Sequence, residues 1–204
     1  MDFQLISLRL ADAASHKTPA LVVLVAEGFK PGSDALSALV RRATASGDFK
    51  TEAGKLLPSF APERVAAERV VLAGIGDGTP AKARKAVLAA LGALKGGPAK
   101  KVTVCFAQSA APGAVAAAVT AAAEAAYMYT ATKSKEALKD TTELTQASIG
   151  VPDPQAAGAE FAQAVGVAEG VRMAREWANR PANHATPRQL AEAARGLARL
   201  PRID

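Results

Sequence analysis

Short apolar runs separated by helix-like segments are the feature that most limits what this chain can fold into. Leu21 to Val25 is continuously apolar, which predicts a central strand buried on both faces, and Lys101 to Phe106 predicts another strand. Phe3 to Leu8 alternates in polarity, as a half-buried strand does. Further extended segments are predicted at Phe49 to Phe60, Arg69 to Ala73 and Leu144 to Val151.

Helices are predicted between most of these strands from their caps and their apolar spacing. Ser33 is suited to cap one helix, and Gly47 follows that helix as a stop. Thr79-Pro80 starts another helix, with cap and proline in the favoured order. The predicted helices cover Ser33 to about Arg42, Pro80 to about Leu94, Pro112 to about Thr130, Gln155 to Ala178 and Pro187 to about Leu200.

The alternation of strands and helices predicts an α/β fold. We expect a three-layer sandwich, in which a central mixed, largely parallel sheet of about six strands has helices on both faces. After Pro152 the chain has no predicted strand before Pro201 to Asp204, where a strand begins with nothing to pair with. The prediction is therefore an α/β domain at residues 1–152, followed by a helical connector at residues 153–204.

The basic charge is the bulk property that suggests a partner. The formal net charge is +6 and the sequence pI is about 9.6, which is compatible with nucleic-acid binding. The lysines and arginines are spread along the chain with almost no aromatic residues between them, whereas a nucleic-acid footprint needs charge gathered on one face. A solvated basic surface is the favoured interpretation, and DNA binding stays open as an alternative.

The residues that catalysis or metal binding would need do not occur at matching spacings. His16 and His184 are far apart in the sequence, and neither has a carboxylate or a cysteine at ligand spacing. Glu136, Asp140 and Glu143 would share a helix face, but lysines interleave with them, so a solvated, charge-compensated surface loop is favoured. No catalytic residue and no metal ligand is therefore assigned to this chain.

Three features predict a cytoplasmic protein without a membrane segment. Cys105 is the single cysteine and lies in an apolar strand, where a small core residue is favoured over a nucleophile. Met1 to Gln4 is acidic and alternating, unlike a signal peptide. The alanine-rich run from Ala110 to Ala126 is too weakly hydrophobic for a membrane span, so a buried or amphipathic helix is expected there.

Gly74, Gly76 and Gly78 form the pattern that most suggests a ligand. The three glycines follow a predicted strand and precede a helix, where exposed N–H groups could bind a phosphate. The spacing nevertheless lacks the full G-x-G-x-x-G pattern, and Gly96-Gly97-Pro98 stands where a ribose-binding acid is expected. A structural turn between strand and helix is the favoured interpretation, with nucleotide binding as the alternative.

The segment from Arg175 to Pro187 carries the most specific pattern in the chain. It has the form Arg-x-x-x-Asn-x-Pro-x-Asn-x-x-Thr-Pro, and it lies between two predicted helices. Asn179 is suited to end the first helix in a left-handed conformation, and Thr186 is suited to cap the second. The residues interpreted as structural parts of a connector are Arg175, Asn179, Pro181, Asn183, Thr186 and Pro187.

This pattern resembles the segment that joins the two domains of leucyl aminopeptidases, the cytosol aminopeptidase family. Weaker similarities follow in the same order along the chain. Gly47 to Lys55 resembles a glycine- and lysine-containing hairpin of the family, Val70 to Gly76 resembles its strand ending in Gly-x-Gly, and Tyr127 to Lys135 resembles the end of its next helix. The resemblance covers essentially the whole chain and points to the N-terminal part of a bacterial-type member.

The resemblance implies a two-domain, homohexameric metallopeptidase that removes N-terminal residues, leucine prominently, from peptides. It implies two divalent metals, manganese or zinc, held by a C-terminal catalytic domain whose ligand motifs do not occur in this chain. It implies that the chain is inactive alone and serves assembly or active-site access beside its own catalytic domain. N-terminal domains of this family are similar to the macro fold, so ADP-ribose binding at Gly74 to Gly78 is the fold-based alternative.

Overall fold

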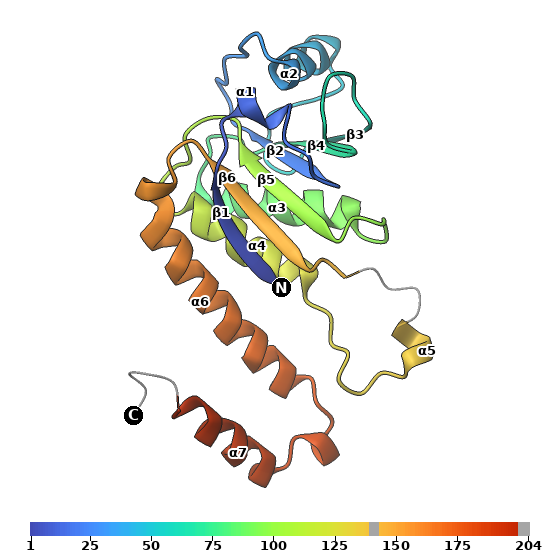
Figure 1. Ribbon diagram of the computed structural model, residues 1–204, viewed down its shortest axis with the longest axis vertical. Coiled ribbons are helices and arrows are strands. Elements are labelled where there is room, and N and C mark those ends of the chain that lie inside the picture. The colour runs from blue at the N-terminus through green and yellow to red at the C-terminus, as the bar shows by residue number, and fades with distance from the viewer. Residues whose placement is uncertain (139–142, 200–204) are drawn as a thin grey trace. The chain divides into compact units, whose positions relative to one another are not determined.

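The computed structural model describes residues 1–138 and 143–199 (Figure 1). Its contacts divide the chain into two compact units, Met1–Tyr127 with Thr141–Ala168, and Met128–Asp140 with Glu169–Asp204. The first unit contains the strands, and the second contains the C-terminal helical segments. Two of the predictions, the strand at Pro201 to Asp204 and the position of Asp140 in the acidic group, lie outside the described residues.

Six strands form one sheet in the first unit. They are β1 (Asp2–Ser7), β2 (Leu21–Val25), β3 (Leu56–Phe60), β4 (Arg69–Gly74), β5 (Lys101–Phe106) and β6 (Gln146–Val151). Their order across the sheet is β1-β6-β5-β2-β4-β3. All neighbouring pairs are parallel except β3 with β4, which pair antiparallel at one edge. The five residues of β2 are all fully buried, as the continuous apolar run predicts for a strand inside a parallel sheet.

Successive side chains of a strand point to opposite faces, and each face of this sheet has its own hydrophobic core. On one face, Val22 and Leu24 belong to the core shared with α3 (Pro80–Leu94), α4 (Ala114–Ala126) and the part of α6 (Pro154–Ala178) up to Ala168. On the other face, the core of Leu21 and Val23 includes α1 (Leu10–Ala13) and α2 (Ala35–Ser46). The predicted α/β sandwich with a mixed, largely parallel sheet is therefore confirmed.

Two predicted helix starts are wrong by one or two residues, and each has a local cause. The cap of α2 is Asp34 rather than Ser33, because the Asp34 carboxylate accepts the N–H of Ser37 at 2.8 Å. α4 begins at Ala114 rather than at Pro112, because Gly113 takes the left-handed conformation with φ 83°. The stop at Gly47 and the end of α3 at Leu94 agree with the structure. α2 nevertheless continues to Ser46 rather than ending at about Arg42, and α4 ends at Ala126 rather than at about Thr130.

The second unit contains α5 (Lys135–Leu138), the rest of α6, the 3₁₀ helix Ala182–His184 and α7 (Pro187–Leu197). α5 is a single turn within the segment predicted as a surface loop. The left-handed conformation predicted for Asn179 is wrong, because the only described non-glycine residues with positive φ are Ala61 and Arg64. Asn179 instead donates its N–H to Arg175 at 3.0 Å, which continues the helical pattern.

None of the helices in residues 1–138 and 143–199 combines the length and the apolar character that crossing a bilayer requires.

Candidate functional site

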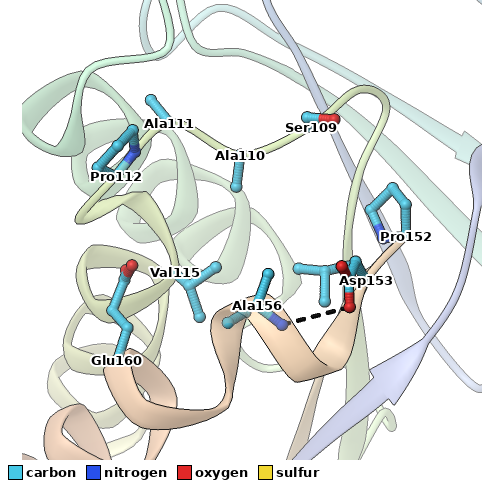
Figure 2. Close-up of a pocket in the computed structure, with 11 residues that line it drawn as sticks. Ser109, Ala110, Ala111, Pro112, Val115, Pro152, Asp153, Ala156 and Glu160 are labelled. Atoms are coloured by element: carbon cyan, nitrogen blue, oxygen red, sulfur yellow. Dashed lines mark hydrogen bonds between the residues drawn. The ribbon is translucent and has the colours of Figure 1, made fainter.

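A cavity of about 410 Å³ opens at the carboxyl ends of β5 and β6 (Figure 2). Ser109 to Pro112, in the loop between β5 and α4, line one side of it, and Ala156 and Glu160 of α6 line another. Ligands of open α/β sheets usually bind outside the carboxyl ends of the parallel strands. This cavity is therefore the strongest candidate for a ligand site in the described part of the first unit.

Two carboxylates of the chain cap the N-termini of α4 and α6 at this cavity. Gly113 has no side chain to cap α4, and Glu160 of α6 supplies the cap: its oxygens accept the N–H groups of Gly113 at 3.2 Å and of Ala116 at 2.7 Å. Asp153 accepts the N–H of Ala156 at 3.2 Å at the start of α6 (Figure 2). Helix N-termini attract anions, and here both positions already hold one. The arrangement disfavours a phosphate-bearing ligand.

The loop with Gly74, Gly76 and Gly78 connects β4 to α3, and its N–H groups are used within the fold. A Cβ on Gly74 would lie 2.4 Å from the carbonyl oxygen of Glu52, and Gly76 and Gly78 have φ values of 55° and 79°. Close backbone approach and turn geometry therefore require these glycines. Their N–H groups donate to the carbonyl oxygens of Lys55, Thr51 and Ile75 at 2.9, 2.7 and 2.9 Å respectively.

Asp77 supplies a negative charge at the start of α3. Its carboxylate accepts the N–H of Thr79 at 3.1 Å and the Nζ of Lys82 at 2.9 Å. The hydrogen bonds from Lys82 and Thr79 lower the pKa of Asp77 to about 2, and the contact with Asp77 raises the pKa of Lys82. The Asp77 carboxylate occupies the position at the start of α3 where a ligand phosphate would bind. The N–H groups of the three glycines already donate hydrogen bonds within the fold, so the nucleotide alternative is not favoured.

The residues with potential for catalysis do not converge. His16 Nε2 lies 3.2 Å from the hydroxyl of Thr103, whereas His184 lies in the 3₁₀ helix of the second unit. Cys105 is buried, and burial raises the pKa of its thiol to about 12, so it is the core residue that the sequence predicts. Within the described residues, no three His, Cys, Asp or Glu side chains are grouped so that they could hold a metal ion.

The connector motif forms the passage from α6 to α7 in the second unit. Thr186 caps α7, as predicted, because its hydroxyl accepts the N–H of Gln189 at 3.4 Å. Gln189 Oε1 accepts the N–H of Thr186 at 2.9 Å, which completes a capping box, and Pro187 is the first residue of the helix. The other motif residues, Arg175, Asn179, Pro181 and Asn183, lie at the end of α6 and around the 3₁₀ helix.

Sequence reasoning missed three charged residues that shape these sites, Glu160, Asp77 and Lys82. Glu160 gives no local signal, because the N–H groups that it accepts lie 44 and 47 residues away in the chain. The pairing of Lys82 with Asp77 had a usable signal. An acidic residue placed two positions before a Thr-Pro helix start indicates an anion that interacts with the helix N-terminus.

Comparison with known proteins agrees with the connector motif. The family model described as the cytosol aminopeptidase family, N-terminal domain, matches residues 22–136. A probable cytosol aminopeptidase of Acidovorax sp. (strain JS42) is 49% identical over 204 residues, which are 100% of this chain and 40% of that protein. Another, from Methylibium petroleiphilum, is 34% identical over 205 residues, covering 100% of this chain and 42% of its own length. The chain thus spans about 40% of the length of these curated relatives.

Solved structures with a similar fold include a leucine aminopeptidase and a bottromycin maturation enzyme. A mutant tomato leucine aminopeptidase gives a TM-score of 0.70 at 21% identity, covering 97% of this chain and 42% of that chain. The bottromycin maturation enzyme BotP in complex with Mn gives a TM-score of 0.65 at 21% identity, covering 89% of this chain and 36% of that chain. The structures agree in fold, and the family model matches more than half of the chain. On the strength of that match, the chain belongs to the cytosol aminopeptidase family and represents its N-terminal domain.

Proposed function

We propose that this chain is the non-catalytic N-terminal domain of a leucyl aminopeptidase, whose remaining part removes N-terminal residues from peptides. The observation that carries the proposal is the coverage of the relatives. Proteins named as probable cytosol aminopeptidases match 100% of this chain, whereas the match covers 40% of their length. In this proposal the domain serves assembly of the enzyme or access of the peptide to its active site.

The chemistry of the described residues supports a scaffold role. They do not group three potential metal ligands, so they do not fit a metal centre, and no reaction step is assigned to them. We propose that two divalent ions, manganese or zinc, act in the rest of the longer protein, where they would polarise the peptide carbonyl. The BotP structure is a complex with Mn, which supports manganese as one of the two candidate metals, because BotP has a similar fold.

Several finer features belong to the same proposal. The α/β domain at residues 1–152 would resemble the macro fold, and residues 153–204 would connect it to the catalytic domain. The connector motif would hold the two helices at the angle that this connection needs. The longer protein would be a cytoplasmic homohexamer that acts on peptides. The cytoplasmic location is supported by the curated relatives, which are named as probable cytosol aminopeptidases.

DNA binding is not part of the proposal, because the cations are spread along the chain and several of the described ones lie beside acids. Ion pairs that bring opposite charges together in the described residues include Arg84 with Glu124, Arg172 with Glu169 and Arg188 with Glu192. Such pairing lowers the local potential that a nucleic-acid footprint requires.

A domain exchange tests the proposal. This chain would replace the matching 204-residue segment of the Acidovorax relative, with which it is 49% identical. The chimera is expected to hydrolyse leucine p-nitroanilide in the presence of manganese or zinc, and to lose that activity with a chelator. The chain alone, assayed with the same metals, is expected to give no turnover. Metal-dependent turnover by the chain alone would reject its non-catalytic assignment.

A further inference from the structure

Apolar side chains form most of the walls of the cavity at the carboxyl ends of β5 and β6. Its volume of about 410 Å³ lies towards the lower end of the range typical of ligand cavities, roughly 300–1,000 Å³. A cavity of this size and position suits a small molecule with an apolar body. The apolar residues that line it include Ala110, Ala111, Pro112, Val115, Val151 and Ala157.

The charged groups of this cavity are all of one sign. Asp153 and Glu160 line it, and none of the other described residues in its walls is a lysine, an arginine or a histidine. The whole chain has a net charge of +6, so the acidic lining does not follow from the overall composition. Figure 2 shows the side chains of Val115 and Ala156 between the two carboxylates. A ligand that complements these walls therefore carries a positive charge and an apolar body.

The Glu160 carboxylate is held in a fixed orientation by the backbone. It is half-buried, and it accepts the N–H groups of Gly113 and Ala116 at 3.2 and 2.7 Å. A carboxylate offers about four lone-pair sites, so about two remain for a further donor. Asp153 is more exposed, and its Oδ1 accepts the N–H of Ala156 at 3.2 Å. Acceptors that are oriented before binding reduce the free energy that a ligand loses in ordering them.

The positive ends of the two helices do not cancel the charge of these carboxylates. A helix N-terminus carries roughly half a positive charge, so one carboxylate at each of two termini leaves an excess of about one negative charge. A phosphate would be repelled by that excess. An ammonium group would be attracted by it, and would also donate charge-assisted hydrogen bonds to the remaining lone pairs of Glu160.

We propose that this cavity binds a small organic cation, whose ammonium group contacts the Glu160 carboxylate and whose alkyl body packs on the apolar walls. The charge of Asp153 adds to the negative potential that attracts the ammonium group. An ammonium has three donors and no acceptor, which matches a wall that offers acceptor oxygens. Free amines and the amino terminus of a peptide share this chemistry. The ligand assignment does not depend on the proposed aminopeptidase role.

A titration of the chain with 3-methylbutylammonium chloride, followed by nuclear magnetic resonance of the backbone amides, tests the site. We expect saturable shifts of the Gly113 and Ala116 signals, because their N–H groups donate to Glu160. The alcohol 3-methylbutan-1-ol has the same carbon skeleton without the charge, and it should bind at least about tenfold more weakly. Potassium chloride at equal ionic strength should cause no saturable shift of these signals.

Glu160→Gln removes the charge, while its side-chain oxygen can still accept hydrogen bonds from the start of α4. It should weaken binding of the amine by at least about tenfold. Asp153→Asn keeps a good helix cap and should weaken binding by about threefold, because Asp153 is exposed. Glu169→Gln is the matched control on the same helix: Glu169 pairs with Arg172, does not line the cavity, and should leave binding unchanged.

Leucinamide distinguishes the two sources of the cation, because it carries the ammonium and the amide of a peptide amino terminus. Tighter binding of leucinamide than of 3-methylbutylammonium identifies a peptide amino terminus as the ligand, and weaker binding identifies a free amine.

Equal binding of the amine and the alcohol overturns the proposal, and so do shifts that potassium chloride reproduces. Unchanged binding of the amine by both folded variants also overturns it, because the amine would then use another surface. The amide spectrum of each variant shows whether the fold is retained. Asp153→Asn decides the question if Glu160→Gln does not fold.

Discussion

The carboxylate of Glu160 on α6 accepts a hydrogen bond of 2.7 Å from the backbone N–H of Ala116 on α4. The other oxygen of the same carboxylate accepts the N–H of Gly113 at 3.2 Å. α4 thus receives its cap from a residue 44 positions further along the chain, and the first part of α6 is fixed to the sheet unit by the same contact. A helix of the predicted connector is therefore also part of the α/β core.

Loss of this cap should destabilise the fold. Glu160→Ala leaves the N–H groups at the start of α4 without an acceptor, which should cost about 1–2 kcal/mol of unfolding free energy. Urea denaturation followed by circular dichroism measures the change. Glu169→Ala is the control on the same helix, because the exposed pair of Glu169 with Arg172 should contribute less than about 0.5 kcal/mol. Equal effects of the two substitutions would contradict the capping role.

Substitution by alanine should lower the stability of the protein at Gly74 and raise it at Gly92. Gly74→Ala places a Cβ 2.4 Å from the backbone oxygen of Glu52, so the backbone at Thr51 and Glu52 must shift, at a cost of about 1–3 kcal/mol or more. Gly92→Ala in α3 meets nothing within 4 Å and should stabilise the protein by about 0.5–1 kcal/mol. Thermal denaturation of both variants measures the difference, and a stable Gly74→Ala variant would refute the close approach.

The pair of Asp77 with Lys82 should make stability depend on pH in an acidic window. The folded-state pKa of Asp77 is about 2, below the ordinary value of 3.8, so the folded state favours the ionised carboxylate. The contribution of the ionised Asp77 carboxylate to the stability of the fold is fully present above about pH 4 and is lost as the pH falls towards about 2. The difference in thermal stability between the wild type and Asp77→Asn should shrink across this window.

Lys82→Met provides the matched test of the cause. The hydrogen bond from Lys82 is the largest contribution to the lowered pKa, so its removal should raise the pKa of Asp77 towards the ordinary value. Nuclear magnetic resonance titration of the Asp77 carboxyl carbon measures this change directly. An unchanged titration would assign the lowered pKa to Thr79 instead.

Cys105 should be unreactive in the folded protein. Burial raises the pKa of its thiol to about 12, so almost no thiolate exists at neutral pH, and the sulfur lies within the core. Ellman's reagent should therefore react with the chain only after unfolding in guanidinium chloride. Reaction of the native protein at the rate of the unfolded chain would show that the strand opens readily.

The elements that sequence predicted best are those whose signals are local. Leu21 to Val25 is a strand within the residues predicted, because a continuous apolar run requires burial on both faces. α3 starts at Pro80 after Thr79, since the order of cap and proline suits a helix start. The cap of α2 is Asp34 rather than the predicted Ser33. Both neighbouring residues are good caps, and only the backbone geometry selects between them.

The candidate sites depended on contacts that local patterns do not encode. The glycine loop was correctly placed between a strand and a helix, but only the fold shows that Thr51 and Lys55 accept two of its N–H groups. Glu160 could not be distinguished by sequence from the other acids of its helix, because its role depends on where α4 begins.

The sequence by itself determined the alternation of strands and helices, the buried strand β2, the connector motif and the absence of a recognisable catalytic pattern. These follow from residue spacing over a few turns or strand lengths, where backbone geometry is set locally. Only the tertiary structure decided the strand order, the capping of α4 by Glu160 and the cavity beside that cap. Those features depend on residues distant in the chain, and their proximity arises from packing of the whole sheet and its helices.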